Sequence, residues 1–361
     1  MVTEDEAMVR AIALAARGLG TTSPNPVVGC LLLGADGEVV GEGFHAYAGG
    51  PHAEIVALAQ AGERARGGTA VVTLEPCNHT GRTGPCSQAL LDAGIKRLVM
   101  AVDDPTSVAA GGAAALRAAG VEVEIGVRHA EAEAGNIAWL TAVQRNRPHV
   151  TWKFAATLDG RSAAADGTSQ WITSAPARGD VHVLRSTVDA IVAGVGTVLA
   201  DDPQLTVRDL RDNSLAITQP LRVVVDSHGR TPETARVRDA AAPTWIATAA
   251  EVGAGADGRT DLDLLLALLY ARDVRAVLLE GGPTLAGAFL AAGLVDKVIG
   301  YVAPKLLGAG LPALVGAGVH TITDAIDLEL TDVTQIGPDL RFTASLRSKP
   351  SDDPTHHPKP E

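Results

Sequence analysis

Cysteine is scarce in this 361-residue chain, occurring three times, at positions 30, 77 and 86. So few cysteines, odd in number, do not provide a disulfide framework. The chain opens with MVTEDEAMVR, where no apolar run follows a basic start. We therefore expect a cytosolic protein of a reducing compartment, without a signal peptide.

Aromatic residues, positive charge and long apolar runs are scarce as well. Phe, Trp and Tyr make up 3% of the residues, too few for a platform on which single-stranded bases stack. The formal net charge of −12 disfavours nucleic acid as a partner, because binding to phosphates requires basic surface. No apolar stretch reaches transmembrane length without Gly, Pro or a charged residue. We expect small-molecule substrates, and neither nucleic acid nor a membrane, as partners.

Two of the cysteines flank a polar loop. The stretch VTLEPCNHTGRTGPC, residues 72–86, places Cys77 and Cys86 among Pro, Asn, Thr, Gly and Arg. Cys30 lies instead in the apolar run VVGCLLL and is expected to pack in a core. A disulfide between the two loop cysteines is one interpretation, and core packing is another. In a polar intracellular loop, however, thiols more often bind a metal or act as nucleophiles.

His52 and Glu54 supply further groups for a metal site. His-x-Glu followed by Pro-Cys is the zinc-deaminase signature. One imidazole and two thiolates hold zinc and leave a fourth position for water, whose pKa the metal lowers. A nearby carboxylate then moves protons. The usual signature separates its cysteines by two residues, whereas eight intervene here.

The long insert between Cys77 and Cys86 narrows the choice among zinc-deaminase families. TTSPNPVVGC, GFHAYAGGPHAE and NHTGRTGPC together resemble the N-terminal half of the bifunctional riboflavin-biosynthesis deaminase/reductase. The resemblance implies that zinc is held by His52, Cys77 and Cys86, with Glu54 as the proton shuttle. It also implies contacts to the pyrimidine and its ribose phosphate from Asn25, His45, His79, Arg82, Asp104 and Thr106.

Several members of that contact set have a plain alternative. Asn25 could form a turn, the two histidines could lie at the surface or behind the site, and Arg82 could be a solvated charge. The family usually has Asp-Pro-Asn where this chain reads DDPTSVAAGG, so Thr106 replaces an asparagine. A hydroxyl makes fewer hydrogen bonds than an amide. One contact to the ribose or phosphate is therefore expected to be lost or replaced, while the zinc set is intact.

The apolar pattern predicts alternating helices and strands in the first part of the chain. Helices are expected over 4–17, from His52, from Pro85 to Ala93, around 111–119 and over 130–146, and strands at 27–33, 38–44, 69–74, 97–102 and 121–127. This alternation predicts a sheet covered by helices. Because His52 and Cys86 both open helices, the metal is expected where helix N-termini converge. Pro148 ends the last helix, which places a domain boundary near Arg147.

A second alternating series follows, with two glycine clusters. AGVGTV and EGGPTLAG come directly after apolar strands. Glycines let backbone amides approach phosphate closely, although at such turns they are more often merely geometric. Neither cluster matches Gly-x-Gly-x-x-Gly, so a Rossmann fold is not predicted.

Other stretches of this half, LDGRSAAADGTSQWITS, TVLADDPQLTVR and LLEGGPTLAGAFLAAGLVD, resemble the reductase half of the same family. The resemblance implies a dihydrofolate-reductase-like fold, the cofactor NADPH, and Lys153, Asp201 and Glu280 as the polar groups near the reacting carbon. It implies substrate contacts from Ser169, Arg185, Leu205, Arg208 and Glu280. It implies cofactor contacts from Ala155, Trp171, Thr197, Asp201, Ser227, Gly282, Pro283, Thr284, Leu285, Ala286, Gly287 and Ala288.

Three of these residues can also be interpreted without the family. Trp171 would pack in a core, and Arg185 would be a charge on a helix surface. Lys153 lies in the apolar run VTWKFAA, where its burial would be costly without an anionic or carbonyl partner.

The sequence therefore predicts an α/β protein of two domains. A cytidine-deaminase-like α/β/α zinc domain at 1–147 precedes a dihydrofolate-reductase-like α/β domain at 148–347, and a Pro-rich, charged tail at 348–361 is expected to be disordered. The first domain, with one Zn²⁺, would deaminate 2,5-diamino-6-ribosylamino-4(3H)-pyrimidinone 5′-phosphate. The second would use NADPH to reduce the ribosyl group of the product, 5-amino-6-(5-phosphoribosylamino)uracil, to ribityl.

Other interpretations stay open. One is a single-activity homologue in which one half only binds. Another is a nucleoside or tRNA deaminase fused to an unrelated reductase, which the acidity and the long insert oppose. A third is a zinc-stabilised structural protein, which would need a fourth protein ligand. The family resemblance also implies a homodimer or homotetramer.

Overall fold

The computed structural model describes residues 2–79, 84–209 and 211–346. Arg82 and the tail at 348–361, which carry two of the sequence predictions, lie outside these residues. By its internal contacts the chain forms two compact units. One reaches Pro148 and takes in Leu269–Arg275, and the other begins at His149 and takes in the rest.

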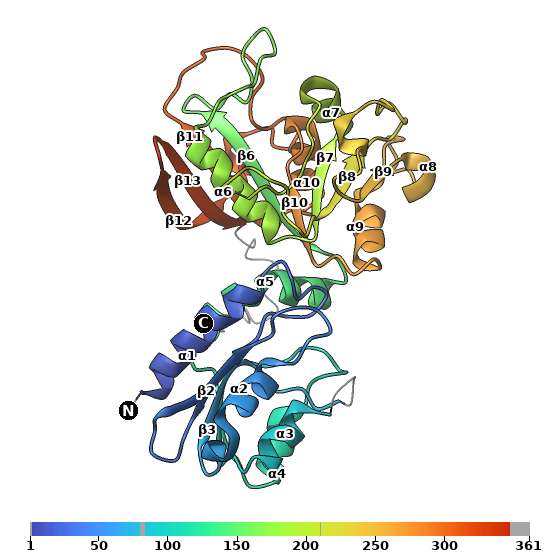
Figure 1. The fold of residues 1–361 in the computed structure, drawn as a ribbon. Helices are drawn as coiled ribbons and strands as arrows, with labels where there is room; N and C mark the ends of the chain where they lie inside the picture. Colours follow the sequence, from blue (N-terminus) through green and yellow to red (C-terminus); the bar gives the residue numbers. More distant parts are fainter. Residues whose placement is uncertain (1, 80–83, 210, 347–361) are drawn as a thin grey trace, which may run out of the picture. The chain divides into compact units, whose positions relative to one another are not determined.

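The first unit is built on a five-stranded mixed sheet with the strand order β2-β1-β3-β4-β5 (Figure 1). Its strands are β1 (Gly29–Leu33), β2 (Val39–Phe44), β3 (Thr69–Leu74), β4 (Arg97–Val102) and β5 (Glu122–Ile125). β1 pairs antiparallel with β2 and β3, whereas β3, β4 and β5 run parallel. The parallel strands bring their carboxyl ends to one edge of the sheet, where connecting loops can meet.

Helices cover both faces of this sheet. They are α1 (Glu4–Ala15), α2 (Ala53–Ala61), α3 (Cys86–Asp92), α4 (Gly112–Ala118) and α5 (His129–Arg145), with 3₁₀ turns η1 (Ala16–Gly18) and η2 (Gly62–Ala65). Successive side chains of a strand point to opposite faces. Cys30 and Leu32 accordingly pack in the core beneath α2, α3 and α4, and Leu31 and Leu33 pack beneath α1 and α5. The result is the predicted α/β/α sandwich, with Cys30 in its core as expected.

Sequence signals explain two local features of this unit. Thr3 and Glu6 form a capping box that starts α1. Gly29 lets the helix approach the sheet, because a Cβ at this position would lie 2.0 Å from the carbonyl oxygen of Ala11. The predicted helix over 4–17 ends earlier, since the chain tightens into η1 after Ala15.

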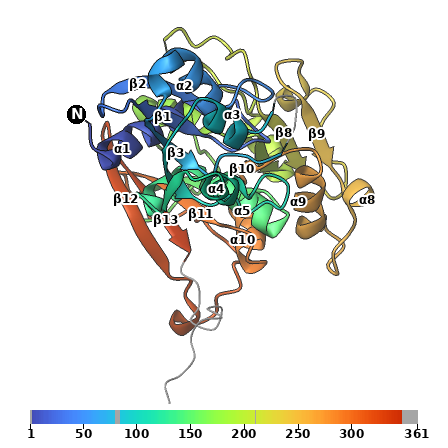
Figure 2. The ribbon, with the colours of Figure 1, turned by 90° about the horizontal axis from the view of Figure 1, so that it is seen from below.

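The second unit contains an eight-stranded sheet with the order β12-β13-β11-β6-β10-β7-β8-β9. Its strands are β6 (His149–Thr157), β7 (Ala190–Gly194), β8 (Leu221–Val225), β9 (Thr244–Ala247), β10 (Ala276–Leu279), β11 (Lys297–Ala303), β12 (Leu328–Ile336) and β13 (Asp339–Leu346). The six strands from β11 to β9 are parallel, and the β12–β13 hairpin joins antiparallel. Figure 2 shows this hairpin at one edge of the sheet and β9 with α8 at the other.

Helices connect the parallel strands, as the alternating pattern predicts. They are α6 (Ala175–Ser186), α7 (Val195–Asp201), α8 (Ala249–Val252), α9 (Leu262–Tyr270) and α10 (Pro283–Ala291), with 3₁₀ turns η3 (Arg236–Arg238) and η4 (Ile322–Asp324). α7 begins directly after β7 and packs with β8 through Val195 and Val198. α6 packs through Ala177 and Val181 against Tyr301 of β11. In the described part of the chain, no helix is long and apolar enough to cross a membrane.

Candidate active sites

His52, Cys77 and Cys86 come together in the first unit. His52 is the N-cap of α2, Cys86 is the first residue of α3, and Cys77 follows β3, so the predicted helix starts are confirmed. His52 Nδ1 lies 3.2 Å from Cys86 Sγ and 3.5 Å from Cys77 Sγ, and all three ligand atoms lie within 4.8 Å of one another. All three cysteines of the chain are free, so the disulfide interpretation is wrong.

This donor set fits zinc. Cys77 Sγ accepts a hydrogen bond from the Cys86 backbone N–H at 3.4 Å. The side chain of Cys86 also bonds to this sulfur and lowers the pKa of Cys77 to about 4, while the same contact raises the pKa of Cys86. An imidazole with two thiolates is a zinc-deaminase ligand set. Within the residues that the structure describes, no fourth His, Cys, Asp or Glu joins the group, which leaves one position for water.

Glu54 lies in the first turn of α2, two residues beyond His52. Its side chain is buried, with 3% of the residue exposed. Burial raises the pKa of the Glu54 carboxyl, and the charge of Cys77 adds to the effect. A carboxyl with a raised pKa can be protonated nearer to neutral pH, as a group that takes up and returns a proton requires.

His45 contacts two residues of the predicted site, Asn25 and His52. Its Nδ1 lies 3.0 Å from the carbonyl oxygen of Pro51, its Nε2 lies 3.3 Å from Asn25 Nδ2, and its ring meets the His52 ring edge-on. A carbonyl only accepts, so Nδ1 carries the proton and Nε2 accepts from the Asn25 amide. Burial lowers the pKa of His45, which keeps the ring neutral. The surface alternative for His45 is therefore wrong.

Thr106 turns its hydroxyl toward Asp104. Its Oγ1 donates to Asp104 Oδ1 at 2.6 Å, and its backbone N–H donates to the same oxygen at 2.8 Å. Asp104 is buried, whereas the loop around it continues to the surface. The hydroxyl that stands in place of the family's asparagine thus fixes the loop in this structure.

Glu75 organises the same loop, and sequence reasoning missed it. Its carboxylate accepts from the backbone N–H groups of Asp104 at 3.2 Å, Gly111 at 3.1 Å and Ala113 at 3.0 Å. The side chain therefore ties the loop that carries Asp104 to the start of α4, next to Cys77. The signal was a glutamate at the end of an apolar strand, directly before Pro-Cys.

His79 and Arg82 complete the predicted set on this side. His79 is half-buried, and its Nδ1 has no hydrogen-bond partner among the described residues. Arg82 lies in the segment that the structure does not describe.

A cavity of about 1120 Å³ lies in the second unit, above the ends of the parallel strands. It brings together most of the predicted reductase residues. Those that line it are Lys153, Ala155, Ser169, Thr197, Asp201, Ser227, Glu280, Gly282, Pro283, Thr284, Leu285 and Ala288. Both glycine clusters contribute to its wall, at the start of α7 and at the start of α10.

Six predicted residues do not line the cavity. Arg185 pairs with Glu280 of its wall, Leu205 and Arg208 lie in the chain after α7, and Trp171 is 62% exposed under the guanidinium of Arg178. The core-packing alternative for Trp171 is therefore wrong. Ala286 is fully buried, and a Cβ at Gly287 would lie 1.8 Å from the carbonyl oxygen of Val315, so these two positions serve helix packing.

Lys153, Arg185 and Glu280 form a buried charged cluster at the cavity. Their side chains are 16%, 15% and 8% exposed. Arg185 donates to both carboxylate oxygens of Glu280, at 2.6 and 3.0 Å, and Lys153 Nζ lies 3.8 Å from Glu280. Lys153 thus has the anionic partner that its apolar surroundings predict, and Arg185 is not a surface charge.

The pKa values of both Glu280 and Lys153 are lowered in this cluster. Burial alone would raise the pKa of Glu280, but the charges of Arg185 and Lys153 outweigh it and hold that pKa at about 2. Burial lowers the pKa of Lys153, and the charge of Arg185 lowers it further against the opposing effect of Glu280. Glu280 therefore stays ionised at neutral pH, between the side chains of Arg185 and Lys153.

The loop after α7 is held in a strained shape. Leu205 is buried with φ +50°, a left-handed conformation that costs a non-glycine residue roughly 1 kcal/mol or more. Buried arginines hold the carbonyls on either side: Arg222 donates to Gln204 O at 3.2 Å, and Arg185 donates to Thr206 O at 3.0 Å. Asp201, at the end of α7, accepts from Ser169 Oγ at 2.9 Å.

Known families match both halves of the chain. Residues 1–102 match the cytidine and deoxycytidylate deaminase zinc-binding region, and residues 148–342 match the RibD C-terminal domain. The riboflavin biosynthesis protein RibD of Mycobacterium tuberculosis is 48% identical over 344 residues, covering 95% of this chain and 97% of that protein.

Solved structures agree over the same length. A Thermotoga maritima diaminohydroxyphosphoribosylaminopyrimidine deaminase/5-amino-6-(5-phosphoribosylamino)uracil reductase superposes with a TM-score of 0.86 at 35% identity, covering 95% of this chain and 99% of that one. Acinetobacter baumannii RibD superposes with a TM-score of 0.85 at 40% identity, covering 96% and 99%. The deaminase-like and reductase-like folds and the family predicted from the motifs are confirmed. The chain belongs to the RibD family of bifunctional riboflavin-biosynthesis proteins.

Proposed function

We propose that this chain catalyses two consecutive steps of riboflavin biosynthesis. The first is hydrolytic deamination of 2,5-diamino-6-ribosylamino-4(3H)-pyrimidinone 5′-phosphate. The second is NADPH-dependent reduction of the ribosyl group of 5-amino-6-(5-phosphoribosylamino)uracil to ribityl. The observation that carries the proposal is the presence of both residue sets in one chain: the His52–Cys77–Cys86 group with Glu54, and the Lys153–Glu280 pair on a cofactor-sized cavity.

In the deaminase half, His52, Cys77 and Cys86 would hold zinc, which would supply Lewis-acid activation of water. Glu54 would move the two protons of that water, passing one to the ring nitrogen and the other to the amino group, which leaves as ammonia. Its raised pKa, caused by burial, supports both roles. The pyrimidine and ribose phosphate are bound by Asn25, which His45 orients, and by His79, Arg82, Asp104 and Thr106.

In the reductase half, bound NADPH would supply the hydride that reduces C1′ of the open-chain or Schiff-base form of the ribose. Lys153, Asp201 and Glu280 surround that carbon. Glu280 is ionised at neutral pH, so it orients Lys153 and leaves proton transfer to Lys153 and Asp201. Ser169, Arg185, Leu205 and Arg208 complete the substrate side.

The dinucleotide would lie along the wall of the cavity. Its contacts would come from predicted residues that line it, which are Ala155, Thr197, Asp201, Ser227, Gly282, Pro283, Thr284, Leu285 and Ala288. The N-terminus of α10 begins with Gly282 and Pro283, where backbone N–H groups are free to approach phosphate.

A 2′-phosphate pocket at Ser227 predicts strong preference for NADPH over NADH. Ser227 lies with His228, Arg230 and Arg259 on the cavity wall. The buried carboxylate of Asp226 fixes this turn by accepting from Thr231 N and Oγ1, both at 2.7 Å. Because charged hydrogen bonds to phosphate are strong, we expect a preference of roughly 10²-fold in kcat/KM. Steady-state kinetics with both cofactors check it, and equal use of NADH would remove the pocket from this segment.

Product identification tests the function as a whole. The diaminopyrimidine phosphate is supplied with and without NADPH, and the products are identified by mass spectrometry. Ammonia and the aminouracil riboside phosphate are expected without NADPH, and the ribityl compound with it. A ribityl product that retains the 2-amino group, or no product at all, would contradict the proposal.

The remaining expectations stay proposals. A cytosolic location rests on the sparse cysteines, and a homodimer or homotetramer rests on the family resemblance. Because both residue sets are present, we favour two activities over a single-activity homologue. The described ligand group of three favours a catalytic zinc over a structural one.

A further inference from the structure

Arg208 differs from the neighbouring arginines in its partners. Arg185 pairs with Glu280, and Arg222 pairs with Asp239. Arg208 instead donates to the Gln204 side chain and, at 3.0 Å, to the carbonyl oxygen of Asn213. Across the described residues no carboxylate pairs with Arg208. Neutral acceptors hold its guanidinium, so no negative charge in the described part of the protein neutralises it.

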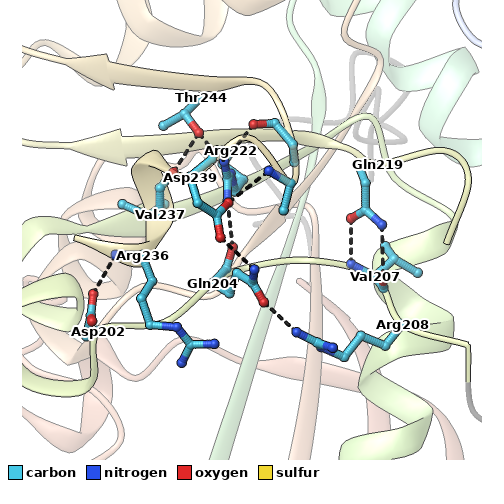
Figure 3. Close-up of polar contacts among 12 residues, drawn as sticks. Asp202, Gln204, Val207, Arg208, Gln219, Arg222, Arg236, Val237, Asp239 and Thr244 are labelled. Atoms are coloured by element: carbon cyan, nitrogen blue, oxygen red, sulfur yellow. Dashed lines mark hydrogen bonds and ion pairs between the residues drawn. The ribbon is translucent and has the colours of Figure 1, made fainter. Parts of the chain in front are cut away.

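Gln204 joins Arg208 to Asp239 through the two ends of its amide (Figure 3). Its Oε1 accepts from Arg208, and its Nε2 donates to Asp239 Oδ2 at 2.6 Å. This orientation is fixed, because a guanidinium only donates and a carboxylate only accepts. The Gln204 amide therefore lies between Arg208 and Asp239.

Arg222 holds the far end of this chain of contacts. It is fully buried on β8 and donates to Asp239 Oδ1 at 2.8 Å and to Thr244 Oγ1 at 2.8 Å. It also donates to the carbonyl of Gln204 at 3.2 Å. Arg222 thus neutralises the charge of Asp239. The side chain of Gln204 bonds to Asp239 and its carbonyl bonds to Arg222, so this ion pair holds both parts of the residue.

The backbone of Arg208 is anchored on the side of the charged cluster. Its N–H donates to His182 Nδ1 at 3.3 Å, and Arg185 donates to Thr206 O at 3.0 Å, two residues before it. Arg208 therefore lies beside the Arg185–Glu280 pair with several of its five N–H donors free of described partners.

We infer that Gln204 is a positioning residue that aims Arg208 at the 5′-phosphate of the reductase substrate and keeps its charge available. A guanidinium binds phosphate through paired, charge-assisted hydrogen bonds. A carboxylate at position 204 would form an ion pair with Arg208. The phosphate of the substrate would then have to displace that carboxylate in order to bind. The inference rests on the proposed function, because that substrate carries the phosphate.

The test compares two substrates in the NADPH-oxidation assay on the full chain. They are the aminouracil riboside 5′-phosphate and the same compound without phosphate. Gln204→Ala is expected to raise KM for the phosphorylated substrate roughly tenfold with kcat nearly unchanged, since it removes the bond that orients a charged group. The dephosphorylated substrate should respond little. Gln204→Glu should raise KM at least as much and should weaken competitive inhibition by inorganic phosphate.

Two further variants distinguish positioning from general support of the loop. In an Arg208→Ala background, Gln204→Ala should cause no additional loss, because the two residues act as one unit. Gln219→Ala is the matched control: Gln219 holds Val207 N and O, both at 2.8 Å, but makes no described bond to Arg208. It should change both substrates alike.

The results that would overturn the role of Gln204 differ from the result that would overturn the proposed function. Equal KM increases for both substrates after Gln204→Ala, or a further loss in the Arg208→Ala background, would overturn the role of Gln204. A Gln204→Glu variant that binds phosphate as the wild type does would also overturn it. A wild-type protein that oxidises no NADPH with either compound would overturn the proposed function, and this inference with it.

Discussion

Glu54→Gln is expected to lower ammonia release by roughly 10²- to 10⁴-fold while zinc stays bound. Glutamine keeps the shape of the buried side chain but cannot take up and return a proton. His52, Cys77 and Cys86 are untouched, so the metal content should remain that of the wild type. Ammonia release and metal analysis measure the two effects.

The reductase half gives the internal control for this variant. NADPH oxidation with supplied aminouracil riboside phosphate should continue at the wild-type rate, because Lys153, Asp201 and Glu280 belong to the other unit. Glu42→Gln makes the same chemical change on β2, beside Arg10, and should leave ammonia release near normal. Loss of both activities in Glu54→Gln would point to a shared site.

Asp201→Asn is expected to lower NADPH oxidation by roughly 10²-fold or more while deamination continues. Asparagine can still accept the hydrogen bond from Ser169, so the local geometry is retained and the charge and the titratable group are lost. The aminouracil riboside phosphate should accumulate when the diaminopyrimidine phosphate is supplied. Product analysis over time measures this directly.

The adjacent residue offers a matched control. Asp202 follows α7 with φ +41°, a conformation that asparagine tolerates, and its Oδ1 accepts from the Arg236 N–H at 2.8 Å. Asp202→Asn should therefore leave reduction almost unchanged. If it lowers NADPH oxidation as much as Asp201→Asn, the effect belongs to the shape of the loop and not to the carboxylate of Asp201.

Much of the metal site could be predicted because its residues lie at the ends of regular elements. The apolar pattern places His52 and Cys86 at helix starts, and parallel strands bring such starts to one edge of a sheet. The zinc-deaminase signature, His-x-Glu followed by Pro-Cys, then indicates the chemistry. The resemblance supplied the contact residues, and the structure adds how His45 orients Asn25.

The supporting residues could not be predicted, because their partners are distant in sequence. Arg185 meets Glu280 across 95 positions, so its helix gives no sign that it is buried. Arg222 stands in the strand LRVVV, where it resembles an ordinary exposed charge, yet its acceptors in Asp239, Ala242 and Thr244 come 17 to 22 residues later. Glu75 likewise bonds to backbone N–H groups 29 to 38 residues away, and Gln204 bonds to Asp239, 35 residues away. Only folding brings these partners together.

The central claim is that one chain carries two separate sites, and zinc removal tests it most directly. The full-length protein is treated with a chelator, its folding is followed by thermal unfolding, and both half-reactions are measured before and after zinc is restored. We expect ammonia release to be lost and then recovered, while NADPH oxidation with the supplied aminouracil riboside phosphate persists throughout. Loss of NADPH oxidation in a protein that remains folded would contradict the account.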